Sequence, residues 1–128
     1  MQVKSFAIWA NAEKEQVPAL VQSTLVWANE NNLEVHLADQ LKSIDIDSDV
    51  SYFSTKNPPD VDFLLCFGGD GTLISGVRIF SFPSVPVLGV HLGGLGFLAQ
   101  ITPEVLIKKL ECIKTVSYTH LRAHETNV

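Results

Sequence analysis

The sequence predicts an α/β fold: a Rossmann-like, three-layer domain built around a mostly parallel sheet. Two observations lead to this fold class. Apolar, strand-like segments alternate with segments in which apolar residues recur every three or four positions, which is the pattern of βαβ units. The strand-like segment 61–67 is also almost entirely apolar, as expected of a parallel strand that is covered on both faces. We therefore expect helices on both faces of the sheet.

The first half of the chain predicts a strand, a long helix and a second strand. Segment 3–9 is apolar and rich in β-branched and aromatic residues, which is typical of a strand. The helix that follows has Pro18 in its first turn, where the missing N–H costs no hydrogen bond, and we expect it to stop at Asn31-Asn32. Segment 33–38 then alternates like a second strand. Six positions form the predicted buried face of the helix: Val17, Leu20, Val21, Thr24, Trp27 and Ala28.

Segment 41–59 is the least regular part of the chain. It carries aspartates at three alternate positions, 45, 47 and 49, which raises the question of a calcium site. An EF-hand loop needs a glycine at its sixth position and a glutamate at its twelfth. Counted from Asp45, those positions hold Val50 and Lys56. We interpret the segment as a solvated loop.

The second half predicts two more strand–helix pairs. The strand at 61–67 leads into a glycine-rich turn and a short helix at 73–80. A strand at 85–90 leads into a second glycine-rich turn at 92–96. Thr102-Pro103 marks the start of the last helix, with Thr as N-cap and Pro at the first helical position. Its predicted apolar face consists of Val105, Leu106, Leu110 and Ile113.

Composition limits the possible partners and location. The 128 residues suit one domain with a single core. A net charge of −5 argues against a nucleic-acid or membrane-surface partner, and no apolar run approaches the ~18 residues of a membrane span. Because Met1 leads directly into a strand without a signal-peptide layout, we expect a cytoplasmic protein. Cys66 and Cys112 lie in apolar surroundings without metal-ligand spacing, so we expect two core thiols in a reducing compartment.

The end of the chain does not fit the preceding pattern. We expect the nucleotide-binding domain to comprise residues 1–115 and residues 116–128 to be a non-native tail. Segment 116–126 abandons the amphipathic pattern of the last helix and resembles a translated sequencing-library adapter; the alternative is a genuine polar tail. His120 and His124 are four positions apart, but no third ligand is near them in sequence, so no metal-ligating residues are predicted.

The turn Gly68-Gly69-Asp70-Gly71-Thr72 carries the chemistry. It lies between a buried strand and a helix, at the edge of an open α/β sheet where ligands bind. Glycines there let a ligand approach the backbone, and helix N-terminal amides favour phosphate oxygens. An acid in the middle of the turn faces the ligand, where it can accept a proton from an attacking hydroxyl or help to hold a metal. The competing interpretation makes Asp70 a helix N-cap only.

Two motifs together resemble a known family. The string from Phe67 to Leu73 (FGGDGTL) and the string from Pro86 to Ala99 (PVLGVHLGGLGFLA) resemble the amino-terminal domain of an NAD kinase. The first motif is shared with diacylglycerol and sphingosine kinases, and loosely with phosphofructokinases, whereas the second is the one that discriminates. The resemblance extends over residues 3–115.

The resemblance implies a reaction: ATP-dependent phosphorylation of the 2′-hydroxyl of the adenosine ribose of NAD, which yields NADP. Asp70 matches the family's acid, which is expected to be the general base. Gly71 matches the neighbouring position, whose backbone contacts the dinucleotide, while Gly68, Gly69 and Thr72 shape the phosphate turn. A divalent ion, usually magnesium, would accompany ATP.

Three further positions are assigned through the resemblance. Phe97 matches an aromatic residue that lies against an adenine, with plain core packing as its alternative. Leu98 fills the following position. Ser75 stands where many relatives carry a basic or imidazole side chain that contacts the ligand, so the resemblance does not assign that contact to Ser75, and Arg78, one turn on, is the alternative.

The family also has parts that this sequence lacks. Neither its Asn-Glu signature nor its β-rich carboxyl-terminal domain finds a match after Thr115. We therefore expect this chain to be inactive by itself and the full-length parent to be a homo-oligomeric enzyme. Two alternatives stay open: a lipid kinase of the same superfamily, and a non-catalytic nucleotide-binding α/β module.

Overall fold

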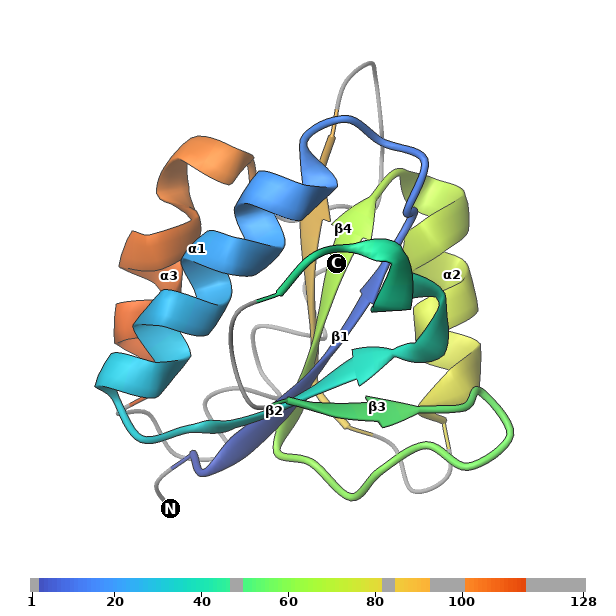
Figure 1. Ribbon diagram of the computed structural model, residues 1–128, viewed down its shortest axis with the longest axis horizontal. Helices are drawn as coiled ribbons and strands as arrows, with labels where there is room; N and C mark the ends of the chain where they lie inside the picture. The colour runs from blue at the N-terminus through green and yellow to red at the C-terminus, as the bar shows by residue number, and fades with distance from the viewer. Residues whose placement is uncertain (1–2, 47–49, 82–84, 93–100, 115–128) are drawn as a thin grey trace.

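The sheet has five parallel strands in the order β3-β2-β1-β4-β5 (Figure 1). This is a computed structural model, and it describes residues 3–46, 50–81, 85–92 and 101–114. The strands are β1 (Ser5–Ala10), β2 (Glu34–Ala38), β3 (Ser51–Phe53), β4 (Phe63–Gly68) and β5 (Val87–His91). The helices are α1 (Val17–Glu30), α2 (Asp70–Ile79) and α3 (Leu106–Ile113), with short 3₁₀ helices η1 (Asp39–Ser43) and η2 (Pro103–Val105). The predicted parallel α/β fold is confirmed.

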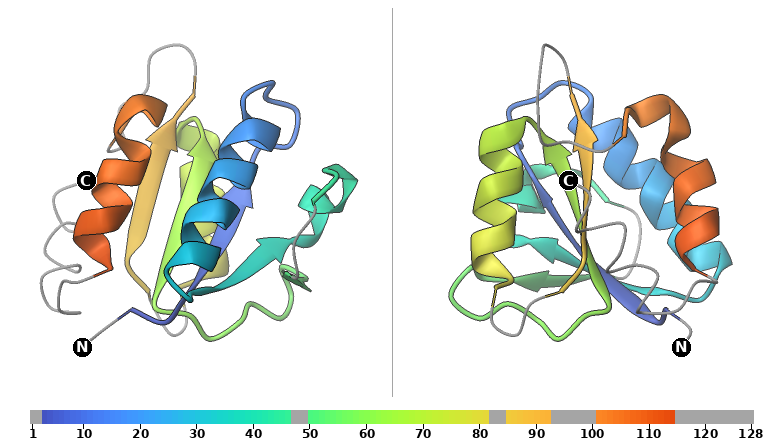
Figure 2. Two further views of the ribbon diagram at one scale, coloured as in Figure 1. Left: turned by 60° about the vertical axis from the view of Figure 1, so that its left-hand side comes forward. Right: turned by 180° about the vertical axis from the view of Figure 1, so that it is seen from behind.

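Helices cover both faces of the sheet, as predicted. Figures 1 and 2 show α1 and α3 on one face and α2 on the other. Right-handed crossovers explain this arrangement. From β1 the chain crosses through α1 to β2 on one side, whereas from β4 it crosses through α2 to β5 on the opposite side. Because the two crossovers run in opposite directions, their helices lie on opposite faces.

The first helix begins and ends close to the predicted positions. Pro18 lies in the first turn of α1. At the other end the N–H of Asn31 donates to the carbonyls of Trp27 and Ala28, and Asn32 adopts a left-handed φ of 58°, a conformation that asparagine tolerates better than most residues. All the predicted buried positions of α1 are buried except Leu20, which is half-buried, and Leu25 is buried as well.

The main core lies between the sheet and the layer of α1 and α3. The rings of Phe6 on β1 and Phe63 on β4 stack with their centroids 4.8 Å apart. Trp27 of α1 packs against Phe6 at 6.3 Å. Three of the four predicted apolar positions of the last helix are buried, whereas Val105 is exposed. Val105 belongs to the 3₁₀ turn that precedes α3, so it does not share the face of the α-helix that follows.

Three sequence predictions need correction. Segment 41–59 contains a strand, β3, because Phe53 is buried at the edge of the sheet and meets Phe80 edge-to-face at 5.5 Å. The helix predicted at 73–80 begins three residues earlier, at Asp70. Cys66 is buried, but Cys112 is exposed. Leu110 and Ile113 lie on the buried side of α3, and the rotation of about 100° per residue turns Cys112 away from that side. The predicted tail, 116–128, lies outside the described residues.

Helix α2 packs directly on the sheet through Gly76. A Cβ atom built at Gly76 would lie 2.7 Å from Sγ of Cys66 and 3.1 Å from side-chain atoms of Leu64 and Trp9. A side chain there would require the Cys66 side chain or the helix to shift. Among the helices of the described residues, none is long and apolar enough to cross a membrane.

We expect Gly76→Ala to lower the free energy of unfolding by about 1–3 kcal/mol, because overpacking forces helix and sheet apart. Urea denaturation of the chain measures the change. Ser75→Ala is the matched control, since Ser75 is the exposed neighbour on the same helix and its replacement should alter stability by less than about 0.5 kcal/mol. Equal stability of the two variants would refute the close contact.

The two cysteines should differ in reactivity. Burial raises the pKa of the Cys66 thiol far above its usual range, so this thiol is both inaccessible and protonated at neutral pH. Titration with a chromogenic disulfide reagent at pH 8 should detect one fast thiol, Cys112, in the folded chain and two in urea. A fast second thiol in the folded chain would contradict the burial of Cys66.

Candidate active site

A single residue links β4 to α2. Strand β4 ends at Gly68, Gly69 is the N-cap residue with φ −104° and ψ −164°, and α2 begins at Asp70. The turn is tied to its neighbours through backbone hydrogen bonds. The N–H of Asn11 donates to the carbonyl of Phe67 at 3.0 Å, and the N–H of Leu92 donates to the carbonyl of Gly68 at 3.1 Å. The loops after β1 and β5 therefore hold the end of β4 on both sides.

The structure places Asp70 at the first helical position of α2, where its side chain is half-buried. The interpretation of Asp70 as an N-cap is wrong, because Gly69 occupies that position. A carboxylate in the first turn still complements the helix dipole, a contribution of about 0.3–1 kcal/mol. That contribution accounts for an acid here but not for the glycines around it.

The glycines of the turn differ in what the protein requires of them. A Cβ atom at Gly68 would lie 2.5 Å from Oγ1 and 2.6 Å from Cβ of Thr72, so packing of Thr72 over the strand end explains this glycine. At Gly69 and Gly71 a Cβ atom would meet no atom of the described residues within 4 Å. Neither residue has a left-handed φ. Their backbone is therefore open, which leaves it available to a ligand.

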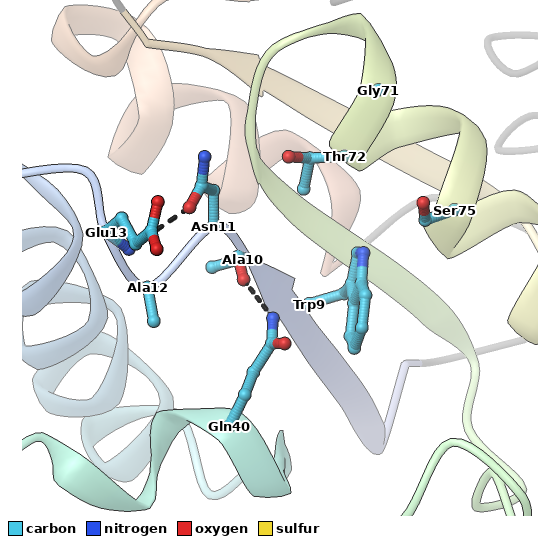
Figure 3. A pocket seen from close by; sticks show the side chains of 9 residues that line it. All are labelled: Trp9, Ala10, Asn11, Ala12, Glu13, Gln40, Gly71, Thr72 and Ser75. Atoms are coloured by element: carbon cyan, nitrogen blue, oxygen red, sulfur yellow. Dashed lines mark hydrogen bonds between the residues drawn. The ribbon is translucent and has the colours of Figure 1, made fainter.

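A pocket of about 610 Å³ lies beside this turn, within the usual size range of ligand sites, about 300–1,000 Å³. It is found where the carboxyl ends of β1 and β4 adjoin, the point at which the chain order across the sheet reverses. Ligands of open α/β sheets bind at such switch points. Nine residues line the pocket (Figure 3): Trp9, Ala10, Asn11, Ala12, Glu13, Gln40, Gly71, Thr72 and Ser75.

Three of the residues assigned from the sequence line this pocket: Gly71, Thr72 and Ser75. The others in the turn, from Gly68 to Asp70, belong to the same strand–helix junction but are not among the lining residues. Phe97 and Leu98 lie outside the described residues. The predicted phosphate turn therefore adjoins the pocket through Gly71 and Thr72, and Ser75 follows them on the same helix, α2.

The opposite wall of the pocket comes from the loop after β1 and from η1, and the sequence did not predict it. Oδ1 of Asn11 accepts a hydrogen bond from the N–H of Glu13 at 3.1 Å, and the amide of Gln40 donates to the carbonyl of Ala10. These contacts fix the Asn11 side chain and tie η1 to the end of β1. A signal existed in the sequence: Asn11 follows the first strand, and the carboxyl ends of parallel strands meet at the same edge of a sheet.

Comparison with known families decides the assignment. Residues 6–118 match the family described as the ATP-NAD kinase N-terminal domain. The chain belongs to the NAD kinase family. The resemblance in the two glycine motifs is thereby confirmed, and the lipid kinase alternative is not favoured.

Curated relatives support the NAD kinase assignment over most of the chain. The NAD kinase of Methanosphaera stadtmanae is 35% identical over 112 residues, which cover 87% of this chain and 39% of that protein. The NAD kinase of Syntrophotalea carbinolica is 36% identical over 109 residues, covering 85% and 38%. The chain thus spans about two fifths of the length of these relatives.

A solved structure shares the fold. Yeast NADH kinase complexed with NADH superimposes with a TM-score of 0.73 at 19% sequence identity, and the match covers 89% of this chain and 36% of that one. The Rossmann-like domain predicted from the sequence is the NAD kinase amino-terminal fold.

The open and the packed glycines should respond differently to alanine. Gly68→Ala should lower the free energy of unfolding by about 1–3 kcal/mol, because the new methyl group collides with Thr72. Gly71→Ala should leave stability unchanged or raise it by up to about 1 kcal/mol, because alanine is the better helix former. Urea denaturation compares the two variants, and a large loss of stability in Gly71→Ala would show that its surroundings are closed.

Proposed function

We propose that this chain is the nucleotide-binding half of an NAD kinase, an enzyme that phosphorylates the 2′-hydroxyl of the adenosine ribose of NAD with ATP and produces NADP. One observation carries the proposal. The acid of the family motif, Asp70, stands at the first position of α2, directly after a buried strand and at the sheet edge that holds the pocket. Family membership supplies the reaction class.

In the proposed reaction, the Asp70 carboxylate accepts the proton of the ribose 2′-hydroxyl. The oxygen forms a bond to the γ-phosphorus of ATP, the bond to the β,γ-bridging oxygen breaks, and ADP leaves. Amides at the start of α2, with the open backbone of Gly69 and Gly71, would stabilise negative charge on the phosphate oxygens. Phe97 would lie against an adenine, with Leu98 beside it, and Ser75 would be a weaker ligand contact than a basic side chain.

Magnesium would come with ATP. Among the described residues, no group of three or more His, Cys, Asp or Glu side chains is placed to hold a metal ion. In the proposed reaction the ion would accompany the phosphates of ATP and would spread the charge that develops during transfer. NAD and ATP are the proposed small-molecule partners. We also propose that the full-length protein is cytoplasmic and homo-oligomeric, with this chain inactive by itself because an interface site needs both of its walls.

The general-base role predicts the effect of Asp70→Asn. In the full-length product of the gene, the variant should lose about 10²–10⁴-fold in kcat for NADP formation from NAD and ATP, while the Kd for NAD changes little. A coupled assay for NADP measures turnover.

Near-normal turnover in Asp70→Asn would contradict the general-base role. The remaining alternative is a non-catalytic nucleotide-binding module, which predicts nucleotide binding without turnover in either protein. Phosphorylation of diacylglycerol without phosphorylation of NAD would instead support the hypothesis that the full-length protein is a lipid kinase.

A further inference from the structure

Trp9 places a buried hydrogen-bond donor at the candidate site. It lies near the end of β1, beside Cys66 of β4 in the parallel register, and its ring packs against Gly76 of α2. The indole is half-buried and lines the pocket. Its Nε1 is sealed from solvent and has no hydrogen-bond partner among the described residues. A sealed donor without a partner destabilises a folded chain, so it requires an explanation.

The position of Trp9 suggests what its partner is. Figure 3 shows the nitrogen edge of the indole turned toward the part of α2 that carries Thr72 and Ser75, and neither hydroxyl accepts a hydrogen bond from it. Nε1 of Trp27 is sealed as well, but the carboxylate of Glu111 lies near it and interacts with it. Trp27 also packs against Phe6 on the other side of the sheet and lines no part of this pocket. Trp9 differs from Trp27 because its unpaired Nε1 belongs to a residue that lines the pocket.

We propose that Trp9 is a ligand-binding residue whose indole N–H donates a hydrogen bond to a phosphate oxygen of the nucleotide in this pocket. The inference rests on the proposed function, which supplies the nucleotide. A phosphate oxygen fits better than a sugar hydroxyl, because the wall next to the indole is the first two turns of α2, whose N-terminal amides favour anions. Open backbone at Gly71 lets such a group come close.

A hydrogen bond between Nε1 of Trp9 and a phosphate oxygen requires a small rearrangement of the pocket wall. In the chain without ligand, Nε1 is covered, so the phosphate oxygen reaches it only after a side chain at the wall moves. Ser75 is exposed and stands at that wall, which leaves its side chain free to rotate. Ligand binding should then change the surroundings of the indole itself.

Two tryptophans make the experiment clean, since the chain contains no others. In a Trp27→Phe background, Trp9 is the sole indole, and its fluorescence is followed during titration with MgATP, inorganic triphosphate or adenosine. We expect a spectral change with MgATP and with triphosphate but none with adenosine. Trp27→Phe serves also as the matched control, and it should leave the Kd for MgATP unchanged.

The role of the N–H is tested by replacing Trp9 with β-(3-benzothienyl)alanine, which keeps the shape of the ring and lacks the donor. This change should raise the Kd for MgATP about tenfold, measured by calorimetry, and raise the thermal midpoint of the unliganded chain. Trp9→Phe should weaken binding similarly, although it also leaves a gap in the packing. A variant that binds MgATP more weakly and is more stable without ligand would distinguish a ligand-binding tryptophan from a purely structural one.

Several results would overturn the inference. An unchanged Kd in both Trp9 variants would do so, as would a spectral response to adenosine that equals the response to triphosphate. If Ser75→Ala abolished the difference between wild type and the benzothienyl variant, the N–H would act through Ser75 and not on the ligand. Absence of MgATP binding by the chain would also overturn it, whereas the Asp70→Asn assay on the full-length product tests the proposed function separately.

Discussion

The parallel pairing of β1 with β4 is the contact on which the site depends. At the beginning of the pair, Oδ2 of Asp62 accepts hydrogen bonds from the N–H groups of Lys4 and Ser5 at 2.7 and 3.1 Å, and the N–H of Asp62 donates to the carbonyl of Ser5 at 3.0 Å. At its end, the N–H of Asn11 donates to the carbonyl of Phe67. The two strands are thus held at both ends, and neither can slide. This fixed register places the loop after β1 opposite the start of α2 and so defines the pocket.

The glycines near this pair have two separate tasks. Gly68 and Gly76 allow close packing, the first under Thr72 and the second against Cys66 of the sheet. Packing among the described residues does not require a glycine at position 69 or 71, because a Cβ atom there would meet no neighbour within 4 Å. A string of glycines in sequence is therefore a mixture of positions where packing requires a glycine and positions where packing does not. Only the structure separates them.

Much of the fold follows from the sequence because it depends on local patterns. The apolar run at 61–67, the amphipathic face of α1 and the glycine turn after β4 each carry their own signal. Strand β3 carries none, since three residues at a sheet edge are too few to show an alternation. Cys112 was misplaced because apolar neighbours in sequence do not put a residue on the buried face of a helix: Leu110 and Ile113 share that face, whereas Cys112 is exposed.

The site was harder to predict than the fold, for a physical reason. Asp70 and Thr72 belong to one motif, and Ser75 follows it by two residues, so they could be found together. Trp9, Asn11 and Gln40 reach the pocket only because β1 and β2 lie beside β4 in the sheet. No local sequence pattern determines the order of strands in a sheet, so this wall of the pocket could be identified only from the tertiary structure.

The one-residue junction at Gly69 has a consequence for variation in length. Successive residues of an α-helix are rotated by about 100°, and here no loop absorbs such a rotation between the buried end of β4 and the first turn of α2. An insertion or deletion of one residue would turn Asp70 and the residues after it by about 100° around the helix axis relative to the sheet. The position of β4 in the sheet therefore determines the direction in which Asp70 projects from the start of α2.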